Sequence, residues 1–504
     1  MIHTDRPADI ERFRSAVARR LGLHFEDAKL GFLADTLRRR LDAIGQSSDV
    51  YLARLETGNL PDEVGALAQE LTVPETYFFR NSDQFRALAE IALPDRVAAQ
   101  SGARRLRILS AGCASGEEAY SLAILIRETV DPSWDVSILG VDVNPAILEK
   151  ALRARYSAWA LRETPAHVQQ RWFRPDGREF RLDEAPRVAV RFEAHNLAQD
   201  NPQLWQPATY DIVFFRNVLM YFTHEIGHAV VARIGRALKP GGYLFLGHAE
   251  TLRGLSGDFH LRHTHDTFYY QRRDQLEPSA RSSATSAPSR RPVPTVIAAV
   301  ESADTWIDAI RLATERIETL TDPARPRSES RSPAATPAWD LESAHELLRE
   351  ERFTEALETM QRLPVESGRD PEVLLLSAVL QTHRGQLIEA EDVCRRLLEV
   401  DELSTGAHYL LALCREGAGD PTGAVYHDQV AIYLDPGFAM PHLHLGLIAR
   451  RAGDRATAQR ELGQALLLLL REDGSRLLLF GGGFGRDTLV ALCRTELIAC
   501  GGTP

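Results

Sequence analysis

The sequence predicts a multidomain α/β protein: a helical N-terminal domain, a doubly wound α/β sheet domain, a disordered linker and an all-α domain of repeats. Three observations support this prediction. The chain has 504 residues, which corresponds to about three domains at roughly 100 to 200 residues each. Short apolar runs alternate with helical stretches in one part of the chain, and a turn motif recurs every 34 residues in another.

Residues 1–90 are predicted to form the helical domain. Their apolar residues follow helical spacing, for example over Ile10–Leu21 and Phe25–Ile44, without an alternating strand pattern. From Arg105, short apolar runs alternate with helical stretches, which predicts a doubly wound sheet over residues 91–274. The apolar runs read LRILSAG, VSILGVD, VAVRFEAHNL, YDIVFFRN, GYLFLGH and DTFYYQR.

Residues 275–338 are predicted to form a flexible linker. Eight of the 26 prolines fall within residues 276–338, and Ser, Thr, Ala and Arg fill most of the other positions. Such a composition cannot bury an apolar core. Within it, residues 296–320 have near-helical apolar spacing, consistent with a short helix that is either free or docked on a domain.

Residues 339–504 contain a repeat of 34 residues. A turn glycine and a small residue recur in one register, and Phe353 with Ala356 extends that register upstream. This period is typical of tetratricopeptide repeats, in which paired helices pack closely at the small residue. After Ser475, the GGGFGR segment is interpreted as a turn before a capping helix, since no Lys-Ser/Thr follows it as in a phosphate loop. The recurring residues are Gly385, Gly419 and Gly453, with Ala390, Ala424 and Ala458.

Composition excludes several functional classes. The 59 basic and 70 acidic residues give a net charge of −11, which argues against a general nucleic-acid binder. Residues 339–475 alone hold 13 Arg, no Lys and 24 acids, also −11, so the repeats are a candidate surface for a basic protein partner. The five scattered cysteines suggest reduced core thiols. No signal-peptide pattern or bilayer-length apolar run occurs, so we expect a cytoplasmic protein without membrane insertion.

The residues that follow the predicted strands carry the chemistry. The first strand ends in small residues, including Gly112, that allow a ligand to approach the backbone, and two glutamates follow at Glu117 and Glu118. The second strand ends at Asp142, where a carboxylate can accept hydrogen bonds from ribose hydroxyls. No GxGxxG motif occurs, and acids at a helix start would repel a pyrophosphate. These acids suit S-adenosylmethionine, which has a ribose and a sulfonium charge.

Several further blocks occur in order along the chain: TYFFR at 76–80, SAGCASGEEAYS, GVDVNPAILEKA, Asn196-Leu197, FRNVLMYF at 215–222 and KPGGYLFLGHAE. With these blocks, the chain resembles the CheR family, the chemotaxis receptor glutamate O-methyltransferases, over roughly residues 10–273. Pro74 departs from the polar residue that is common in the family's cofactor loop. The resemblance implies cofactor contacts at Thr76, Arg80, Glu117, Asp142, Asn196, Leu197, Arg216 and Asn217, with Arg80 and Tyr221 nearest the reacting methyl group.

The resemblance also implies the reaction. S-adenosyl-L-methionine would methylate glutamates on chemoreceptor cytoplasmic helices, S-adenosyl-L-homocysteine would be the product, and no metal would be required. A glutamate with a pKa of about 4.3 is already ionised at neutral pH, so its attack on a methyl group needs orientation rather than a general base. We expect Arg80 to hold and aim the acceptor carboxylate, with Tyr221 acting from a second side.

A basic run in the helical domain is the predicted docking face for the receptor. Arg38, Arg39 and Arg40 are interpreted either as a solvated face or as the basic helix that, by family resemblance, meets acidic receptor helices. A hairpin predicted between Trp172 and Pro186 is short, which disfavours tethering of a receptor's C-terminal peptide through it.

A metal site was the competing interpretation of two histidine patterns. The HExxH match at His224–His228 lacks a suitable third ligand, because only Glu250 follows and it lies beyond a predicted strand. The cluster of His260, His263 and His265 falls on a predicted edge hairpin. We therefore predict no metal site.

Two other functions remain open from the sequence alone. The enzyme could methylate a different acceptor, because acceptor choice depends on surfaces that the motifs do not specify. The catalytic fold could also serve only as a cofactor sensor on a protein-interaction scaffold, although Arg80, Asn217 and Tyr221 are all present. The partner of the repeats is not readable from the sequence.

Overall fold

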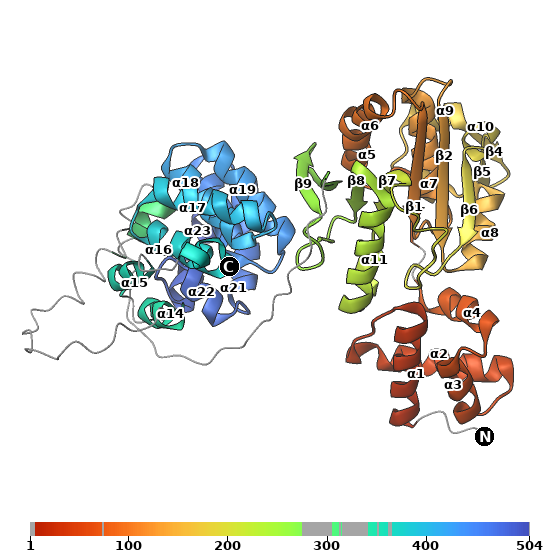
Figure 1. Cartoon of the computed structure of the whole chain (residues 1–504), viewed down its shortest axis with the longest axis horizontal. Coiled ribbons are helices and arrows are strands. Elements are labelled where there is room, and N and C mark those ends of the chain that lie inside the picture. Colours follow the sequence, from red (N-terminus) through yellow and green to blue (C-terminus); the bar gives the residue numbers. More distant parts are fainter. Residues whose placement is uncertain are drawn as a thin grey trace, which may run out of the picture. The chain divides into compact units, whose positions relative to one another are not determined.

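The structure is a computed structural model that describes residues 6–72, 75–274, 305–311, 314, 341–349, 352–360 and 365–502. It divides into two compact units, residues 1–278 and 279–504 (Figure 1). Pro74 and most of the predicted linker lie outside the described residues. None of the helices in these ranges is long and apolar enough to cross a bilayer.

Four helices form the N-terminal part of the first unit, as predicted. α1 has a proline in its first turn and ends at Gly22 in the left-handed conformation, and both features favour helix boundaries at these points. The helices share a core around the fully buried Phe13, Leu37 and Tyr51. They are α1 (Pro7–Leu21), α2 (Leu30–Ile44), α3 (Ser48–Thr57) and α4 (Pro61–Leu71), with the 3-10 turn η1 (Asp27–Lys29) before α2.

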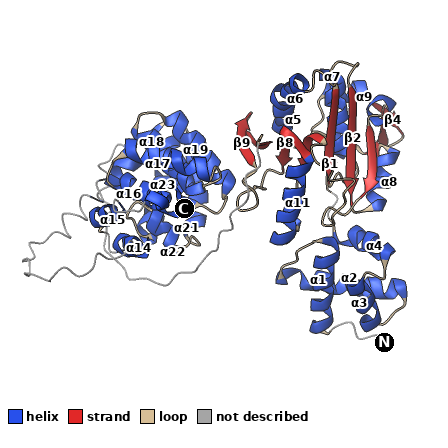
Figure 2. Cartoon of the chain, viewed as in Figure 1, coloured by secondary structure: helices blue, strands red, loops and turns tan. Residues whose placement is uncertain are grey.

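A mixed seven-stranded sheet forms the centre of the first unit and confirms the predicted α/β fold (Figure 2). The strand order is β6-β2-β1-β7-β8-β10-β9; the first five strands run parallel, and β10 is antiparallel to both of its neighbours. β2 lies on one side of β1 and β7 on the other, so the order of the strands reverses at β1. Sheets of this kind bind ligands at the point of reversal. The strands are β1 (Arg105–Ala111), β2 (Asp135–Asp142), β6 (Val190–Ala194), β7 (Tyr210–Phe215), β8 (Leu238–Leu246), β9 (Phe259–Thr264) and β10 (Thr267–Arg272).

Helices connect these strands and pack on the sheet. Aromatic rings fill the interface, and Phe214 of β7 stacks on Phe245 of β8 with 4.5 Å between ring centroids. The elements are α5 (Ser82–Ala87), the π-helical η2 (Leu88–Ala92), α6 (Leu93–Ala99), α7 (Glu117–Thr129), α8 (Pro145–Arg153), η3 (Ala158–Leu161), α9 (Ala166–Trp172), α10 (Glu184–Arg187), η4 (Leu219–Tyr221) and α11 (His224–Ala237). The short hairpin predicted near residue 180 is present as β4 (Phe173–Asp176) and β5 (Glu179–Leu182), and β3 (Arg155–Tyr156) adds a third strand.

The second unit is an array of helix pairs with the predicted repeat. The turn glycines adopt positive φ values of 69°, 77° and 79°, a conformation that favours glycine. The small residues Ala390, Ala424 and Ala458 are fully buried where paired helices cross. The helices are α14 (Leu341–Arg349), α15 (Phe353–Met360), η5 (Val365–Arg369), α16 (Pro371–His383), α17 (Leu387–Val400), α18 (Thr405–Gly417), α19 (Pro421–Leu434), α20 (Ala439–Arg451), α21 (Arg455–Leu469), α22 (Gly474–Phe480) and α23 (Arg486–Ala499).

The glycine-rich segment after α22 forms a turn, and α23 follows it as the expected helix. Gly482 and Gly483 have φ values of 64° and 80° in this turn. The five cysteines are free and buried, which agrees with their interpretation as core residues.

The second unit shows whether the short helix expected within residues 296–320 is free or docked on a domain. Residues 306–311 of the region between the domains are helical, and they are docked rather than free. Trp306, Ile307, Ala309 and Ile310 all belong to the same buried core as the repeat helices.

Candidate functional site

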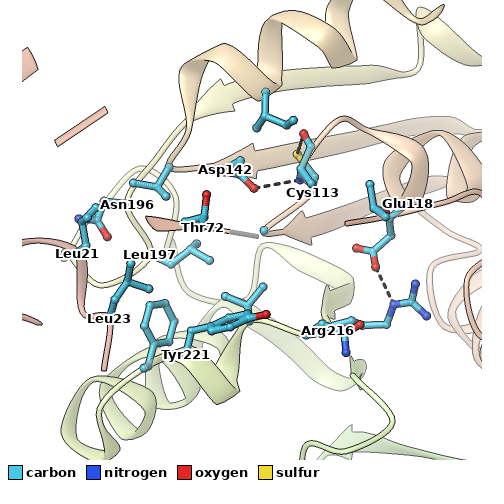
Figure 3. Close-up of a pocket in the computed structure, with 18 of the residues that line it drawn as sticks. Leu21, Leu23, Thr72, Cys113, Glu118, Asp142, Asn196, Leu197, Arg216 and Tyr221 are labelled. Carbon is cyan, nitrogen blue, oxygen red and sulfur yellow. Dashed lines mark hydrogen bonds and ion pairs between the residues drawn. The ribbon is translucent and has the colours of Figure 1, made fainter. Parts of the chain in front are cut away.

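A pocket lies where β1, β2, β6 and β7 end, at the predicted edge of the sheet (Figure 3). Some of its polar residues lie at or just after the ends of these strands, whereas Thr76 and Arg80 come from the segment between α4 and α5 and Glu118 lies on α7. Part of its apolar wall comes from the end of α1. Figure 3 shows Glu118 and Arg216 at one end and Leu21, Leu23 and Asn196 at the other. Eight of the nine predicted cofactor residues line this pocket, together with Tyr221: Thr76, Arg80, Gly112, Asp142, Asn196, Leu197, Arg216 and Asn217.

Glu117 is the predicted residue that does not line the pocket. Its carboxylate accepts a hydrogen bond from the Ser115 hydroxyl at 2.7 Å, and burial raises its pKa. Its neighbour Glu118 lines the pocket instead. Successive helical residues point about 100° apart, so the two adjacent glutamates at the start of α7 have different surroundings.

Asp142 lies at the last position of β2, and the backbone holds its carboxylate in place. Oδ2 accepts from the Ala114 amide at 3.0 Å, and Oδ1 accepts from the Asn144 amide at 2.9 Å. Burial raises the pKa of Asp142, and these backbone hydrogen bonds oppose that shift. A carboxylate oxygen has two lone pairs, so each oxygen retains a site for a ligand donor.

Arg216 lines the pocket, and its guanidinium braces the pocket's wall. Its Nε donates to Glu118 at 2.7 Å, while Nη1 donates to the Gln84 side chain at 2.8 Å and to the Arg80 carbonyl at 2.6 Å. Glu118 also accepts from the Ser110 hydroxyl at 2.7 Å. The buried pair therefore connects the ends of β1 and β7 to the segment that carries Arg80.

Glu250 is a residue whose part in the site was missed by sequence reasoning. Its carboxylate accepts from the backbone amides of Asn217 and Gly247, both at 2.7 Å, and from that of Met220 at 3.2 Å. Asn217 has a φ of 58°, an uncommon value for a side-chain-bearing residue. Glu250 thus holds the turn that places Asn217 and Tyr221. The only available signal was that Glu250 is the last residue of the family block KPGGYLFLGHAE.

Backbone hydrogen bonds join the N-terminal helices to the same loop. The His24 amide donates to the Tyr221 carbonyl at 2.7 Å, and the Thr223 amide donates to the Gly22 carbonyl at 3.2 Å. Gly22 has a φ of 75°, and a Cβ there would lie 2.8 Å from the Ala198 Cβ, so this approach requires glycine.

Asn196 is also used to hold the pocket together. Its Nδ2 donates to the Arg20 carbonyl at 2.6 Å, and its Oδ1 accepts from the Ala198 amide at 3.0 Å. Its pocket position therefore comes with a structural task, because it connects the loop after β6 to the end of α1.

Arg80 and Tyr221, the two residues predicted to face the acceptor, both line the pocket. Arg80 is half-buried, and Tyr221 is 38% exposed. Arg80 donates to the Glu75 carbonyl at 3.1 Å, and its guanidinium lies 5.7 Å from the centre of the Tyr77 ring. Within the described part of the chain, this guanidinium has no carboxylate partner, unlike Arg216. It is thus available to a carboxylate from another molecule.

The three arginines predicted to dock the substrate do not line the pocket, and they differ from one another. Arg40 is largely buried and pairs with Glu63 at 2.7 Å, and Glu63 also accepts from the Tyr51 hydroxyl. Arg39 pairs with Glu70 at 2.8 Å and Arg38 with Asp35 at 2.9 Å, both in exposed positions. Arg40 therefore belongs to a structural ion pair and is removed from the predicted docking residues, while docking through Arg38 and Arg39 stays a prediction.

The histidine motifs have structural partners. Thr223 caps α11 by accepting from the Ile226 amide at 3.3 Å, so HExxH begins an ordinary helix. His263 stacks on Phe268, and His265 contacts Glu90 at 3.0 Å. Across the residues that the structure describes, no group of three His, Cys, Asp or Glu is arranged to hold a metal ion.

Comparisons with known proteins agree on the first unit and extend into the second. Residues 74–268 match the family described as CheR methyltransferase, SAM binding domain. A probable biofilm formation methyltransferase WspC of Pseudomonas aeruginosa is 30% identical over 453 residues, which covers 89% of this chain and 96% of that protein. Chemotaxis protein methyltransferase 2 of Vibrio cholerae is 33% identical over 273 residues, covering 52% of this chain and 92% of that protein.

Proposed function

The chain belongs to the CheR methyltransferase family and uses S-adenosyl-L-methionine, and we propose that it methylates glutamate side chains of chemoreceptors, in the cytoplasm. The observation that carries this proposal is that Arg80 lines the pocket and that its guanidinium has no carboxylate partner in the described part of the chain. A guanidinium in that position suits an anionic acceptor better than a neutral one.

The pocket's side chains fit the cofactor. Leu21, Leu23 and Leu197 provide an apolar wall for a base, and the partly buried Asp142 carboxylate has acceptor capacity left for ribose hydroxyls. Glu118 contributes negative charge at the other end of the pocket. When bound, the cofactor supplies a methyl group on a sulfonium centre.

The chain's own residues then have to orient the acceptor rather than deprotonate it. A glutamate is ionised near neutral pH, so no general base is required. Arg80 would bind one carboxylate oxygen and leave the other directed at the methyl group, and Tyr221 would restrict the acceptor from a second side. Arg216 and Glu250 are positioning residues, because they hold the backbone segments that carry Arg80 and Tyr221.

The proposal is tested by incubating the full chain with cofactor labelled in its methyl group and with chemoreceptor cytoplasmic fragments. We expect label on the fragment that alkali releases, because a glutamyl methyl ester is labile to base. A matched fragment with its methylated glutamates replaced by glutamine should take up no label. Base-stable label would indicate another acceptor group, and cofactor binding without transfer to any fragment would favour the sensor alternative.

A receptor of a biofilm pathway is the second candidate substrate. Similarity to the probable biofilm formation methyltransferase extends through the repeats, whereas the similarity to the Vibrio cholerae chemotaxis methyltransferase covers about half of the chain. Rates on receptor fragments from a biofilm pathway and from a motility pathway would distinguish the two, and a clear preference for the motility receptor would exclude this candidate.

A further inference from the structure

The docked segment, defined as residues 305–311 with Thr314, is a compact helical module within the second unit. The Thr305 hydroxyl donates to Asp308 at 2.7 Å, and the Asp308 amide donates back to that hydroxyl at 3.2 Å. This reciprocal pair resembles a capping box, which stabilises the start of a helix from within its own sequence. The segment therefore carries its own initiation signal.

Specific contacts hold the docked segment on the repeats. Trp306 is only 1% exposed, its indole Nε1 donates to the Tyr409 hydroxyl of α18 at 3.2 Å, and its ring stacks on Phe484 with 5.4 Å between centroids. Asp308 pairs with Arg311 of the same segment at 3.3 Å, and its charge also opposes the lowering of the Arg451 pKa by burial. The aromatic residue of the segment is thus matched to a specific partner on the repeats.

Two turn glycines shape the surface beneath the segment. Gly482 would place a Cβ 2.4 Å from Ile310 Cγ1, and Gly385 would place one 3.0 Å from Arg311 Cδ. We call the surface formed by Tyr409, Arg451, Gly385, Gly482 and Phe484 the receiving surface. Side chains at either glycine would crowd the segment, so the receiving surface fits it closely.

The receiving surface involves the first helices of successive pairs. Every residue of α20 from Ala439 to Ala449 is buried, and so is every residue of α18 from Thr405 to Cys414. Helices at the open face of a repeat array would leave one side in water. Here the docked segment and the segment around Phe480 and Phe484 help to cover that side.

The docked segment is distant in sequence from everything that it touches. Thirty residues, 275–304, separate it from the end of the first unit's described residues, and 26 residues, 315–340, separate it from α14. A helix that is remote in sequence from the surface it covers acts as a linked ligand of that surface. None of the described helix pairs of the repeats includes the docked segment, so its release would break none of them.

We propose that the receiving surface is a binding site for a short amphipathic helix of a partner protein, and that the docked segment occupies it as an intramolecular competitor. The contacts specify the partner's chemistry: an aromatic residue with aliphatic residues one and four positions later, as in Trp306, Ile307 and Ile310. Recognition of one helix face by a groove is a common mode of peptide binding. This inference is independent of the acceptor proposed above.

The test uses full-length protein and a fluorescein-labelled peptide of residues 303–316. Trp306→Ala with Ile310→Ala should vacate the receiving surface and strengthen peptide binding at least ~10-fold over wild type, because the internal competitor is removed. Leu467→Ala is the matched control, since this apolar side chain of α21 is 63% exposed and is not part of the receiving surface, and it should bind like wild type. A double variant that keeps its circular dichroism and melting behaviour but binds no better than wild type would overturn the proposal.

Hydrogen exchange on the wild-type chain decides the matter even if the double variant does not fold. Amides of the docked segment should exchange at least ~10-fold faster than those of α18 and α20, because local release precedes unfolding of the repeats. Equal rates would make the segment a fixed part of the core and contradict the proposal. A dimer whose fraction rises with concentration in sedimentation would identify a second copy as the occupant, which also contradicts a separate partner.

Discussion

The pocket of the first unit and the receiving surface of the second are both assembled from distant parts of the chain, but different interactions form them. In the pocket, Asp142 and Glu250 accept hydrogen bonds from backbone amides of neighbouring loops. In the receiving surface, Tyr409 hydrogen-bonds to the chain's own Trp306, and the absence of a side chain at Gly482 leaves room for Ile310. Polar groups held by the backbone can line a cavity that faces water, whereas an apolar surface is stabilised by being covered.

The largest effect that would test this comparison concerns the buried pair of the pocket. Arg216→Ala leaves the Glu118 carboxylate buried without its cation, and we expect the first unit to lose about 3 to 5 kcal/mol of stability. Arg105→Ala is a matched control, because Arg105 and Asp135 also lie 2.7 Å apart but are both exposed. The control should cost no more than about 1 kcal/mol in chemical denaturation. Similar losses in both variants would show that burial of the Glu118 pair is unimportant.

The next effect separates the two units by pH. In the second unit, burial lowers the pKa of His383 and His427 to about 4 and that of His408 to about 3. The unfolded chain binds these protons near pH 6.5, so the stability present above pH 6.5 is lost as pH falls toward 4. At pH 5 the loss is about 1 to 2 kcal/mol per histidine. Asp428, whose pKa is raised by burial to about 6, opposes this loss between about pH 6 and 4.

The first unit has the opposite tendency. Burial raises the pKa of Asp142, Glu117 and Glu250, so their folded forms gain stability as pH falls toward their unfolded values near 4. Scanning calorimetry of the full chain should show that the melting temperature of the second unit is lower at pH 5 than at pH 7. The first unit is identified as the transition whose melting temperature rises on addition of cofactor, and this melting temperature should not fall between pH 7 and pH 5. Parallel downward shifts of both transitions would contradict the assignment.

The second unit was predictable from a sequence repeat and the first from residues at the ends of predicted strands. Neither kind of pattern predicts contacts between residues that are far apart in the sequence. The 34-residue period located Gly385 and Ala390 because a repeat leaves the same signal several times. The same reasoning could not decide whether residues 296–320 dock. Their partners, such as Tyr409 and Phe484, lie more than 100 residues away and have no periodic relation to them.

In the first unit, residues at strand ends were predictable, but side-chain directions were not. Asp142 lines the pocket as expected because the end of a strand fixes its place. The choice between Glu117 and Glu118 depends on helix phase, and the role of Glu250 depends on a turn that brings it back to Asn217. Arg40 differs from Arg38 because it faces Glu63, which only the packing of α2 on α4 reveals.

A cofactor affinity measurement sharpens the account of Asp142. Asp142→Ala should weaken S-adenosylmethionine binding by about 1.5 to 3 kcal/mol, because charge-assisted hydrogen bonds to the ribose would be lost. Asp135→Ala, at the opposite end of the same strand and exposed, is the control and should not change affinity. Calorimetry that finds equal affinity for wild type and Asp142→Ala would remove this residue from the binding site.

The smallest effect concerns docking. Arg38→Glu with Arg39→Glu should slow methylation of receptor fragments and flatten its salt dependence, while stability changes by only about ±0.5 kcal/mol. Arg40 is left unchanged because its pair with Glu63 is structural. Initial rates at two salt concentrations provide the measurement. Unchanged rates and salt slopes would place receptor docking elsewhere.

The central claim is that Arg80 orients a carboxylate acceptor, and its most direct test compares wild type with Arg80→Ala in single-turnover methylation of a receptor fragment at saturating cofactor. We predict a rate at least ~100-fold lower, because misplacement of the reacting groups has effects of this size. Cofactor affinity measured by calorimetry on the same preparations should stay within about threefold, since Arg80 acts on the acceptor. An unchanged rate, or a loss explained entirely by weaker cofactor binding, would contradict the claim.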